Sequence, residues 1–337
     1  MTDNKITTVE LGNGGPQVGV QGLGCMGMSE FYGDTDESAA RETLETALAA
    51  GVTLFDTADV YGRGANEKFL APFVGAHRGE ITLATKFAIE RTDDPQYRGV
   101  RNDPAYIRQA VEDSLRRLNT DVIDLYYMHR RDPAVPLAES VGAMAELVQQ
   151  GKVKQLGLSE VTGAELREAY AVHPIAALQS EWSLFSRDVE RSAVPAAVEL
   201  GVTFVPYSPL GRGFLTGAFA DAAKDLSKGD FRQYQPRFTG DNAKTNAALL
   251  EPVHKIAAAH GASAAQVALA WVQQRAQVHG LTVVPIPGTR KSSRLLENVA
   301  ATRLTLTAEE LALLEPIAGQ VAGDRYPDMS STSAARE

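Results

Sequence analysis

The sequence predicts a single α/β domain folded as a (β/α)₈ barrel, also called a TIM barrel, over residues 1–323. Eight short apolar segments alternate with segments that have the apolar spacing of helices. The apolar segments are continuous, as expected of strands buried on both faces of a parallel sheet. Eight such units in one chain favour a closed barrel over an open, doubly wound sheet. No internal linker rich in proline, glycine or serine divides the chain, and residues 324–337 are expected to be a flexible C-terminal tail.

The chain opens with a predicted β-hairpin. Its turn is Gly12-Asn-Gly-Gly-Pro16, within the segment from Thr7 to Val20, and Asn-Gly followed by Gly-Pro is typical of a tight turn. The eight predicted strands follow at residues 21–24, 53–56, 81–86, 123–128, 155–159, 176–180, 203–207 and 282–286.

Helices are predicted between these strands. Thr35 or Asp36 can cap the first helix, which ends at Gly51. Asp103 followed by Pro104 starts another, and apolar positions recur at helical spacing as far as Leu118. The others are expected at residues 66–74, 137–150, 164–173, 189–200, 247–260, 263–274 and 292–301. The stretch from 211 to 246 is too long for a plain connection, so we expect a loop that closes over a ligand.

Composition excludes several classes of function. A net charge of −9 argues against nucleic acid or an anionic membrane surface as a partner. No apolar run reaches the length of about 18 residues that a membrane span needs. The single cysteine, Cys25, rules out an intrachain disulfide and fits a reducing compartment. The first ten residues are polar and do not resemble a signal peptide, so we expect a cytoplasmic protein.

The segment from Gly22 to Gly27 matches the dinucleotide fingerprint GxGxxG letter for letter. That motif requires a helix opening directly at the third glycine. Here the following residues, Met28-Ser-Glu-Phe-Tyr-Gly33, read as a loop, and the helix begins only near Glu37. We therefore reject a Rossmann role and expect the glycines to allow close approach of the backbone inside the barrel mouth.

Three consecutive predicted strands end in ionisable residues. Asp56 ends the second strand, Lys86 the third, and His129 follows the fourth, while Tyr61 lies five residues beyond Asp56. In a barrel the carboxyl ends of all strands face one mouth. Adjacent strands lie about 5 Å apart, so these side chains can meet.

This set of residues suits carbonyl reduction by hydride transfer. The developing alkoxide needs a proton and a stabilising field. A phenol has a pKa near 10, and lowering it by two to three units takes roughly 3–4 kcal/mol. We expect the Lys86 ammonium to supply that preference, Asp56 to keep the lysine charged, and His129 to hold the carbonyl oxygen against Tyr61.

Each of these residues also has an ordinary structural interpretation. Asp56 could cap the turn after its strand, and Tyr61 could be a half-buried turn aromatic. Lys86 could be a solvated charge or part of a structural ion pair, and His129 begins a polar run typical of a surface. Their occurrence on consecutive units of one barrel favours the functional interpretation.

From Val18 to about Leu304 the chain resembles the aldo-keto reductase superfamily. The resemblance lies in motifs that recur in this order and at these distances. They are Gly22-Leu-Gly-Cys-Met-Gly-Met-Ser29, Phe55-Asp-Thr-Ala-Asp-Val-Tyr-Gly62, Thr85-Lys86, Tyr127-Met-His129, Leu156-Gly-Leu-Ser159, Leu178-Gln179, Tyr207-Ser-Pro-Leu-Gly-Arg-Gly213, Ile286-Pro-Gly-Thr289 and Glu297-Asn298.

The resemblance implies a barrel whose bottom is plugged by the hairpin, and an NADPH-dependent reductase of aldehydes and ketones. Its catalytic tetrad would be Asp56, Tyr61, Lys86 and His129, with Tyr61 as the proton donor and no metal. The nicotinamide contacts would be Ser159 and Gln179, with Tyr207 stacked on the ring, and Met26 would also bind the cofactor. Ser208, Leu210, Arg212 and Gly213 would lie at the pyrophosphate. The residues at the adenosine end would be Gly288, Thr289, Arg290, Arg294, Glu297 and Asn298.

A basic cluster supports the adenosine end. Barrels of this kind bind phosphates beside their last strands and an adjacent helix start. Arg290, Lys291 and Arg294 gather there, and the arginine fork suits a 2′-phosphate, which favours NADPH over NADH. Two positions depart from the family pattern: Glu160 stands where many members have asparagine, and Gly288 where many have a basic residue.

The substrate pocket is expected to include Met28, Tyr32, Arg130, Trp182 and Phe231. A small-molecule aldehyde or ketone is the expected partner. Two alternatives remain open in the sequence. The chain could be a cofactor-sensing binding subunit with little turnover, since the same fold serves in such subunits, or an alcohol or sugar dehydrogenase working in the oxidative direction.

Overall fold

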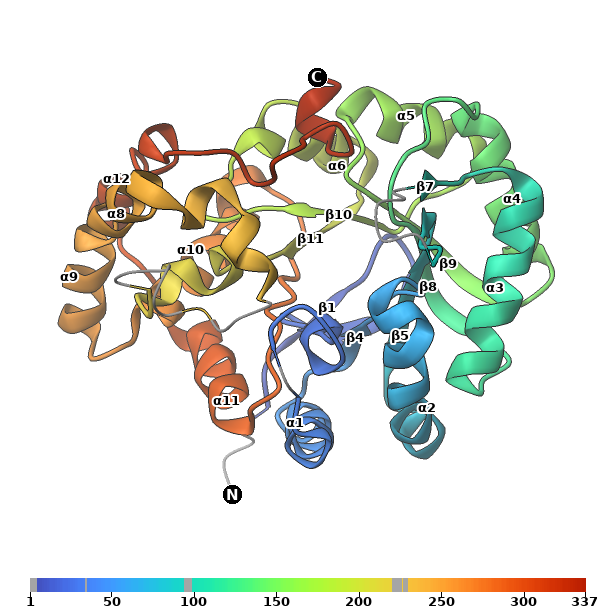
Figure 1. Cartoon of the computed structure of the whole chain (residues 1–337), viewed down its shortest axis with the longest axis horizontal. Coiled ribbons are helices and arrows are strands. Elements are labelled where there is room, and N and C mark those ends of the chain that lie inside the picture. Colours follow the sequence, from blue (N-terminus) through green and yellow to red (C-terminus); the bar gives the residue numbers. More distant parts are fainter. Residues whose placement is uncertain (1–4, 34, 94–98, 220–225, 227–229) are drawn as a thin grey trace.

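The computed structural model describes residues 5–33, 35–93, 99–219, 226 and 230–337. Its centre is a seven-stranded parallel sheet, in the order β11-β10-β9-β8-β5-β4-β3, that curls into a barrel (Figure 1). These strands are β3 (Leu23–Gly24), β4 (Leu54–Asp56), β5 (Thr82–Phe87), β8 (Ile123–Met128), β9 (Val153–Ser159), β10 (Ala177–Glu181) and β11 (Thr203–Tyr207). Single bridges pair Phe204 with Val283 and Gly24 with Gly288, so residues 283–288 occupy the eighth place in the ring. The predicted (β/α)₈ barrel is confirmed.

Helices surround the strands as an outer layer (Figure 1). They are α1 (Glu37–Ala49), α2 (Ala65–His77), α3 (Pro104–Leu118), α4 (Leu137–Gln149), α5 (Gly163–Val172), α6 (Ala193–Leu200), α8 (Gly240–Ala248), α9 (Glu251–His260), α10 (Ala264–His279), α11 (Ser292–Ala300) and α12 (Ala308–Leu314). Every residue of β5, β8 and β10 is buried, which explains their continuous apolar sequence. The Asp36 side chain caps α1 and the Asp103 side chain caps α3, as expected.

The N-terminal hairpin consists of β1 (Thr8–Glu10) and β2 (Gln17–Gly19), paired antiparallel. Leu11 and Val18 are fully buried in a cluster with barrel-interior residues. The Gly12 amide donates to Thr203 Oγ1 at 2.8 Å, at the start of β11. The hairpin therefore closes the amino-terminal end of the barrel, and the carboxyl end is left for a site.

Some elements differ from the prediction. Only residues from Ala193 form α6, because Glu190 belongs to a separate 3₁₀ turn (Asp188–Glu190), where it accepts from Trp182 Nε1 at 3.0 Å and Arg187 Nε at 2.9 Å. A small antiparallel pair, β6 (Ile89–Glu90) and β7 (Gly99–Val100), and the helix α12 were not predicted. The stretch 211–246 holds 3₁₀ turns at Gly211–Thr216, Phe231–Tyr234 and Pro236–Phe238 and the start of α8, and part of it lies outside the described residues.

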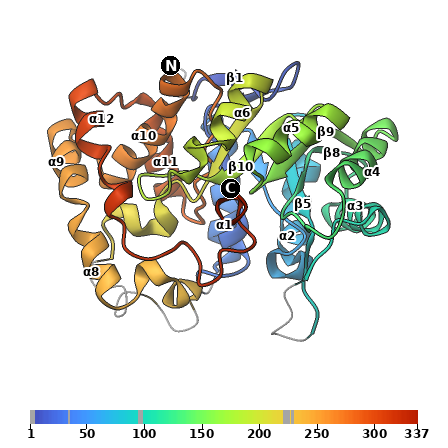
Figure 2. The same cartoon turned by 90° about the horizontal axis from the view of Figure 1, so that it is seen from above.

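The C-terminal segment, expected to be a flexible tail, is packed against the barrel. Arg325, Thr332 and Ser333 are buried. Figures 1 and 2 show the chain end lying near α5 and α6. There Glu337 bonds to Ser192, just before α6. The segment therefore belongs to the wall at the carboxyl end of the barrel.

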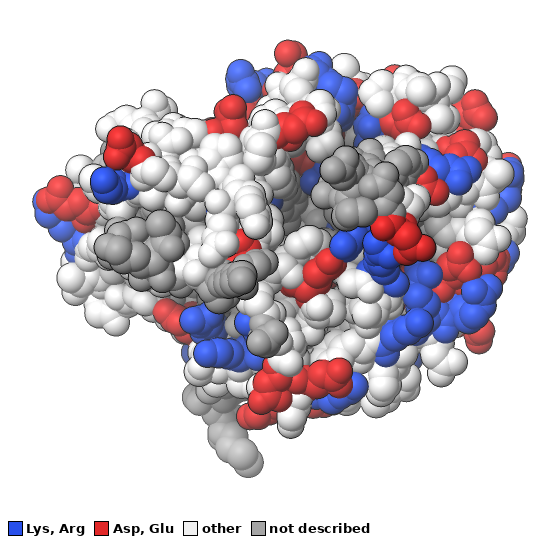
Figure 3. All heavy atoms as spheres, in the orientation of Figure 1, with Lys and Arg blue, Asp and Glu red and all other residues white. Residues whose placement is uncertain are grey.

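The surface carries charges of both signs. Figure 3 shows acidic and basic side chains spread over one face. None of the helices in the described part of the chain combines the length and the apolar character that a membrane crossing needs.

Candidate active site

A large cavity opens at the carboxyl ends of the strands. Its volume is about 1280 Å³, and its lining includes Asp56, Tyr61 and His129. Lys86 lies beneath them, with no exposed surface. The structure therefore brings together the four residues that the sequence placed on three neighbouring strands.

The lysine and the aspartate form the floor of this site. β4 and β5 are adjacent and parallel, and Lys86 Nζ donates to Asp56 Oδ1 and, at 2.8 Å, to the carbonyl oxygen of Thr57. The second carboxylate oxygen of Asp56 accepts from Gln179 Nε2 at 2.8 Å. Both charged groups are thus held in one orientation by hydrogen bonds.

Tyr61 is placed by a turn that follows β4. The turn Tyr61–Gly64 has positive φ at Gly62 (56°) and Gly64 (85°), and the Gly62 amide donates to Glu30 Oε2 at 2.7 Å. The Tyr61 ring centroid lies 5.3 Å from Lys86 Nζ and 5.9 Å from the His129 ring, which it meets edge-on at 86°. The phenol, the imidazole and the ammonium therefore surround the same corner of the cavity.

The protonation states differ in part from the expectation. Burial raises the pKa of Tyr61 well above its ordinary value, the Asp56 carboxylate raises it further, and Arg130 opposes both. The net pKa of Tyr61 is thus raised rather than lowered, in contrast to the expectation, because burial and Asp56 outweigh the neighbouring cations. Burial also lowers the pKa of Lys86, against the attraction of Asp56. Burial, Arg130 and Lys86 lower the pKa of His129 well below its ordinary value. The phenol and the imidazole are therefore both neutral at pH 7.

The residues expected to contact a cofactor all line this one cavity. They are Met26, Ser159, Gln179, Tyr207, Ser208, Leu210, Arg212, Gly213, Gly288, Thr289, Arg290, Arg294, Glu297 and Asn298. A Cβ atom at Gly288 would lie 3.1 Å from the Gly24 carbonyl oxygen, so a side chain there would crowd the barrel rim. That crowding gives a structural reason for the glycine where the family pattern has a basic residue.

The two arginines of the basic cluster, Arg290 and Arg294, differ in their surroundings. Arg290 donates to the carbonyl oxygens of Tyr32 at 2.8 Å and Gly27 at 3.1 Å, so it fastens the loop after β3. Lys291 and Arg294 are exposed at the start of α11 and line the cavity. Arg294 is thus better placed than Arg290 to meet a ligand.

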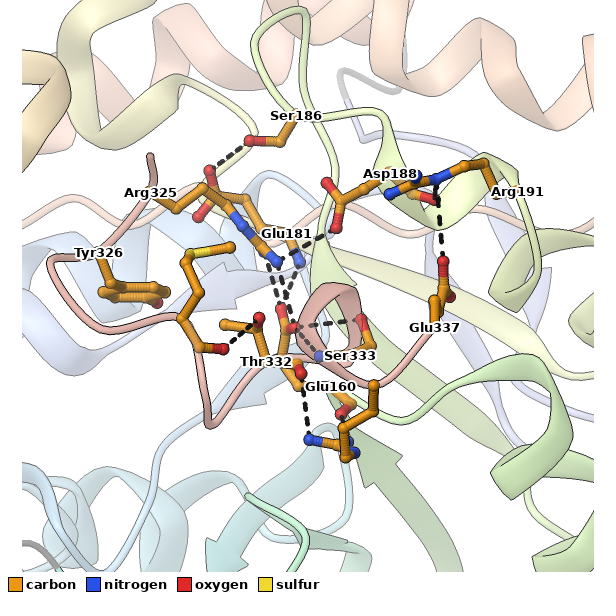
Figure 4. A network of polar contacts seen from close by, with 12 residues as sticks. Glu160, Glu181, Ser186, Asp188, Arg191, Arg325, Tyr326, Thr332, Ser333 and Glu337 are labelled. Atoms are coloured by element: carbon orange, nitrogen blue, oxygen red, sulfur yellow. Dashed lines mark hydrogen bonds and ion pairs between the residues drawn. The ribbon is translucent and has the colours of Figure 1, made fainter. Parts of the chain in front are cut away.

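Glu160 is not directed at the cavity. Its carboxylate is fully buried and accepts from Tyr207 Oη at 2.8 Å. It also accepts from Arg325 Nη1 at 3.0 Å (Figure 4). Burial opposes its ionisation, but Arg325, Arg130 and the Tyr207 hydroxyl together lower the pKa of Glu160 to about 2. The residue is therefore a charged structural partner of the C-terminal segment.

Three of the five residues expected in the substrate pocket, Tyr32, Arg130 and Phe231, line the cavity. Trp182 does not, because its ring is buried against Phe204, 5.0 Å between centroids, and Met28 packs in a core cluster beside α1. These two residues belong to the core.

Sequence reasoning missed part of the cavity wall. Tyr326, Phe31, Phe219 and Arg232 line it as well. The Arg212 guanidinium lies between the rings of Phe231 and Tyr326, 5.1 and 4.9 Å from their centroids. Tyr326 lies in the C-terminal segment that the sequence predicts to be a flexible tail. The only signal for it in the sequence is the motif residue Arg212, because a buried guanidinium often packs against an aromatic ring.

The glycines of residues 22–27 allow close approach of the backbone inside the barrel mouth, as expected. A Cβ atom at Gly24 would lie 3.0 Å from the Ile286 carbonyl oxygen. The third glycine, Gly27, lies in a short 3₁₀ turn, and α1 begins only at Glu37. No helix opens at the motif, which confirms that it is not a Rossmann phosphate loop.

Comparison with solved structures gives related proteins that match along almost the whole chain. A glycerol dehydrogenase from Gluconobacter oxydans has a TM-score of 0.81 at 27% identity, with 97% of this chain and 99% of that one covered. A thermostable aldo-keto reductase in complex with the inhibitor epalrestat has a TM-score of 0.71 at 29% identity, covering 93% and 100%. An aldo/keto reductase from Klebsiella pneumoniae in complex with NADP and acetate has a TM-score of 0.69 at 26% identity, covering 95% and 98%.

The family model described as the aldo/keto reductase family matches residues 22–318. That span contains the barrel strands, the cavity floor and the basic cluster. The chain belongs to the aldo/keto reductase family.

Proposed function

We propose that this chain reduces aldehydes and ketones to alcohols with NADPH, and that Tyr61 donates the proton. The observation that carries the proposal is the meeting of a neutral phenol, a neutral imidazole and a buried ammonium–carboxylate pair at one corner of a cavity. The same cavity extends to exposed cationic side chains at α11. Membership of the family and the related structure solved with NADP support the same conclusion.

The residues that line the cavity suit both ends of NADPH. Its Tyr61 end offers the amide of Gln179 and the hydroxyl of Ser159 beside the candidate catalytic residues. Its other end carries Lys291 and Arg294, which suit a phosphate on the ribose. When bound, the reduced nicotinamide supplies a hydride to the carbonyl carbon.

The side chains of this protein supply the proton and the electrostatic field. The carbonyl oxygen gains negative charge, and the neutral Tyr61 hydroxyl can both hydrogen-bond to it and donate the proton. The neutral imidazole of His129 offers a second hydrogen bond. The Lys86 ammonium, 5.3 Å from the centre of the phenol ring, favours the phenolate that remains after transfer.

The test is NADPH oxidation with a panel of aromatic and aliphatic aldehydes and ketones. Tyr61→Phe should lower kcat by about 100- to 10,000-fold, the usual contribution of a positioned acid, while the affinity for NADPH is kept. Tyr234→Phe, at an exposed tyrosine, is the matched control and should keep wild-type turnover. Equal turnover in Tyr61→Phe and the wild type would remove the mechanism.

A second candidate is oxidation of an alcohol or polyol. The glycerol dehydrogenase of Gluconobacter oxydans, 27% identical, favours it. The same residues serve both directions, with the phenolate form of Tyr61 accepting the proton of the alcohol. Initial rates with glycerol and NADP⁺, measured beside rates with aldehyde and NADPH at equal enzyme concentration, separate the two. A higher kcat/KM for glycerol would replace the reductive assignment.

A further inference from the structure

Glu160 gathers hydrogen-bond donors from three separate parts of the chain, namely β10, β11 and the C-terminal segment. It follows β9 directly, and its backbone has a positive φ of 52°. Its Oε1 accepts from Tyr207 Oη at 2.8 Å, from Arg325 Nη1 at 3.0 Å and from the Glu181 amide at 3.2 Å. Its Oε2 accepts from the Ser333 amide at 3.1 Å, from Ser333 Oγ at 3.3 Å and from Arg325 Nη2 at 3.4 Å.

These donors leave the carboxylate no acceptor site for a cofactor. An ionised carboxylate offers about four lone-pair directions, and six donors already converge on Glu160. The side chain is also fully buried. The role left for it is to hold other parts of the protein.

What Glu160 holds is residues 325–336, which we call the C-terminal clamp. Arg325 begins the clamp with a side chain only 2% exposed, and it also pairs with Asp188 at 3.2 Å. At the other end, Arg336 Nη2 donates to the carbonyl oxygen of Glu160 at 2.6 Å. Figure 4 shows Arg325 and Ser333 approaching Glu160 from different sides. Both ends of the clamp are thus fastened to one residue.

The clamp brings an aromatic side chain to the cavity. Tyr326, next to Arg325, lines the cavity, and its hydroxyl accepts from Arg212 Nη2 at 2.5 Å. The Tyr326 and Tyr207 hydroxyls lie 3.2 Å apart, and Tyr207 in turn is bonded to Glu160. Two tyrosines of the cavity wall are therefore positioned by the same carboxylate, one directly and one through the clamp.

We propose that Glu160 is a positioning residue that fastens the C-terminal clamp across the cavity, so that Tyr326 forms a fixed wall of the substrate pocket and the Tyr207 hydroxyl is held in place. The role of Tyr326 as a wall for the substrate rests on the proposed carbonyl reduction. The attachment of the clamp to Glu160 does not depend on that function. Glu160 acts through Arg325, Ser333 and Tyr207 and touches no reacting atom.

The attachment of the C-terminal clamp is tested by hydrogen exchange of the full chain, followed by mass spectrometry. This measurement does not require catalytic activity. Glu160→Gln and Arg325→Met should each raise exchange at residues 324–337 by about tenfold or more, since each removes a charge-assisted bond. Arg78→Met is the matched control, because Arg78 bonds to the buried carboxylate of Asp124 and the Val122 carbonyl at the opposite end of the barrel. It should leave exchange in the clamp unchanged.

Unchanged exchange in the clamp of Arg325→Met, or an equal rise in Arg78→Met, would overturn the proposal. A cofactor complex with the carboxamide nitrogen within hydrogen-bond distance of Glu160 would also overturn it. If Glu160→Gln does not fold, Arg325→Met and Ser333→Ala decide the question, because each removes a clamp donor and leaves the carboxylate in place.

The consequence for substrate is tested by kinetics. Arg325→Met should raise KM for bulky aldehydes by about tenfold and change kcat by less than about threefold, because the pocket wall moves while Tyr61 does not. Tyr326→Ala should reproduce the change in KM without changing exchange at the Ser333 amide. Equal losses in kcat and kcat/KM would contradict the role of Tyr326 as a wall of the substrate pocket. They would indicate damage to the catalytic residues instead. If the wild type oxidises no NADPH with any carbonyl, the proposed function fails, while hydrogen exchange still decides the fastening.

Discussion

Lys86 and Asp56 form an ion pair almost entirely shielded from water, with side-chain exposures of 0% and 4%. Each partner keeps one further bond, from Lys86 to the Thr57 carbonyl oxygen and from Gln179 to Asp56. Removal of charges from water is costly, and a buried pair is stable only when its geometry and hydrogen bonds are complete. The pair therefore ties the stability of the barrel to the integrity of the candidate site.

Lys86→Met is expected to damage both stability and activity. Loss of the ammonium leaves Asp56 buried without its charge partner, which typically costs about 3–5 kcal/mol. The midpoint of urea denaturation should fall, and turnover should be lost. Lys255→Met, at an exposed pair with Glu251, should change the free energy of unfolding by less than about 1 kcal/mol. A Lys86→Met protein as stable as the control would contradict the water-excluded pair.

The Tyr61 phenol is expected to stay protonated in the free enzyme up to high pH. Burial and Asp56 raise its pKa, so its neutral form is the one present throughout the neutral range. Titration of tyrosinate absorbance should be the same for the wild type and Tyr61→Phe from pH 6 to about pH 10, the ordinary pKa of a phenol. Loss of a step near pH 7–8 in Tyr61→Phe would show instead that Lys86 governs this group.

The two arginines near α11 should have different effects on cofactor choice. Arg294 is exposed and lines the cavity, so Arg294→Ala should weaken NADPH by about tenfold and NADH little. Arg290→Ala removes bonds to the loop after β3 and should weaken both cofactors alike. Dissociation constants from fluorescence titration test this, with Arg108→Ala on α3 as the exposed control. Equal loss of both cofactors in Arg294→Ala would exclude it as the 2′-phosphate ligand.

Acid should release part of the stability supplied by Glu160. Its pKa is lowered from 4.5 to about 2 in the folded protein, so its contribution is complete above about pH 4.5 and is lost as pH falls towards 2. A shift of this size corresponds to about 3 kcal/mol. The free energy of unfolding of Glu160→Gln should therefore fall less steeply between pH 4.5 and pH 2 than that of the wild type. Parallel curves would contradict the depressed pKa.

The sequence determined the barrel and the identity of most cavity residues. Continuous apolar strands, capped helices and ionisable residues at three successive strand ends are local signals, and the parallel sheet brings those ends together by its regular spacing. Asp56, Lys86 and Gln179 could be placed for that reason. Trp182 could not, because the sequence does not say which face of a strand end turns to the core.

Only the tertiary structure decided that the C-terminal segment lies across the cavity and which ionisable side chains are charged and paired. Residues 324–337 have a polar sequence with no strong element of their own, and their packing comes from bonds to residues more than a hundred positions away, such as Arg325 to Glu160. Burial, not sequence spacing, also sets the pKa of Tyr61 and makes Glu160 a fastening point. Local patterns specify elements, whereas long-range desolvation and ion pairing exist only once the chain has folded.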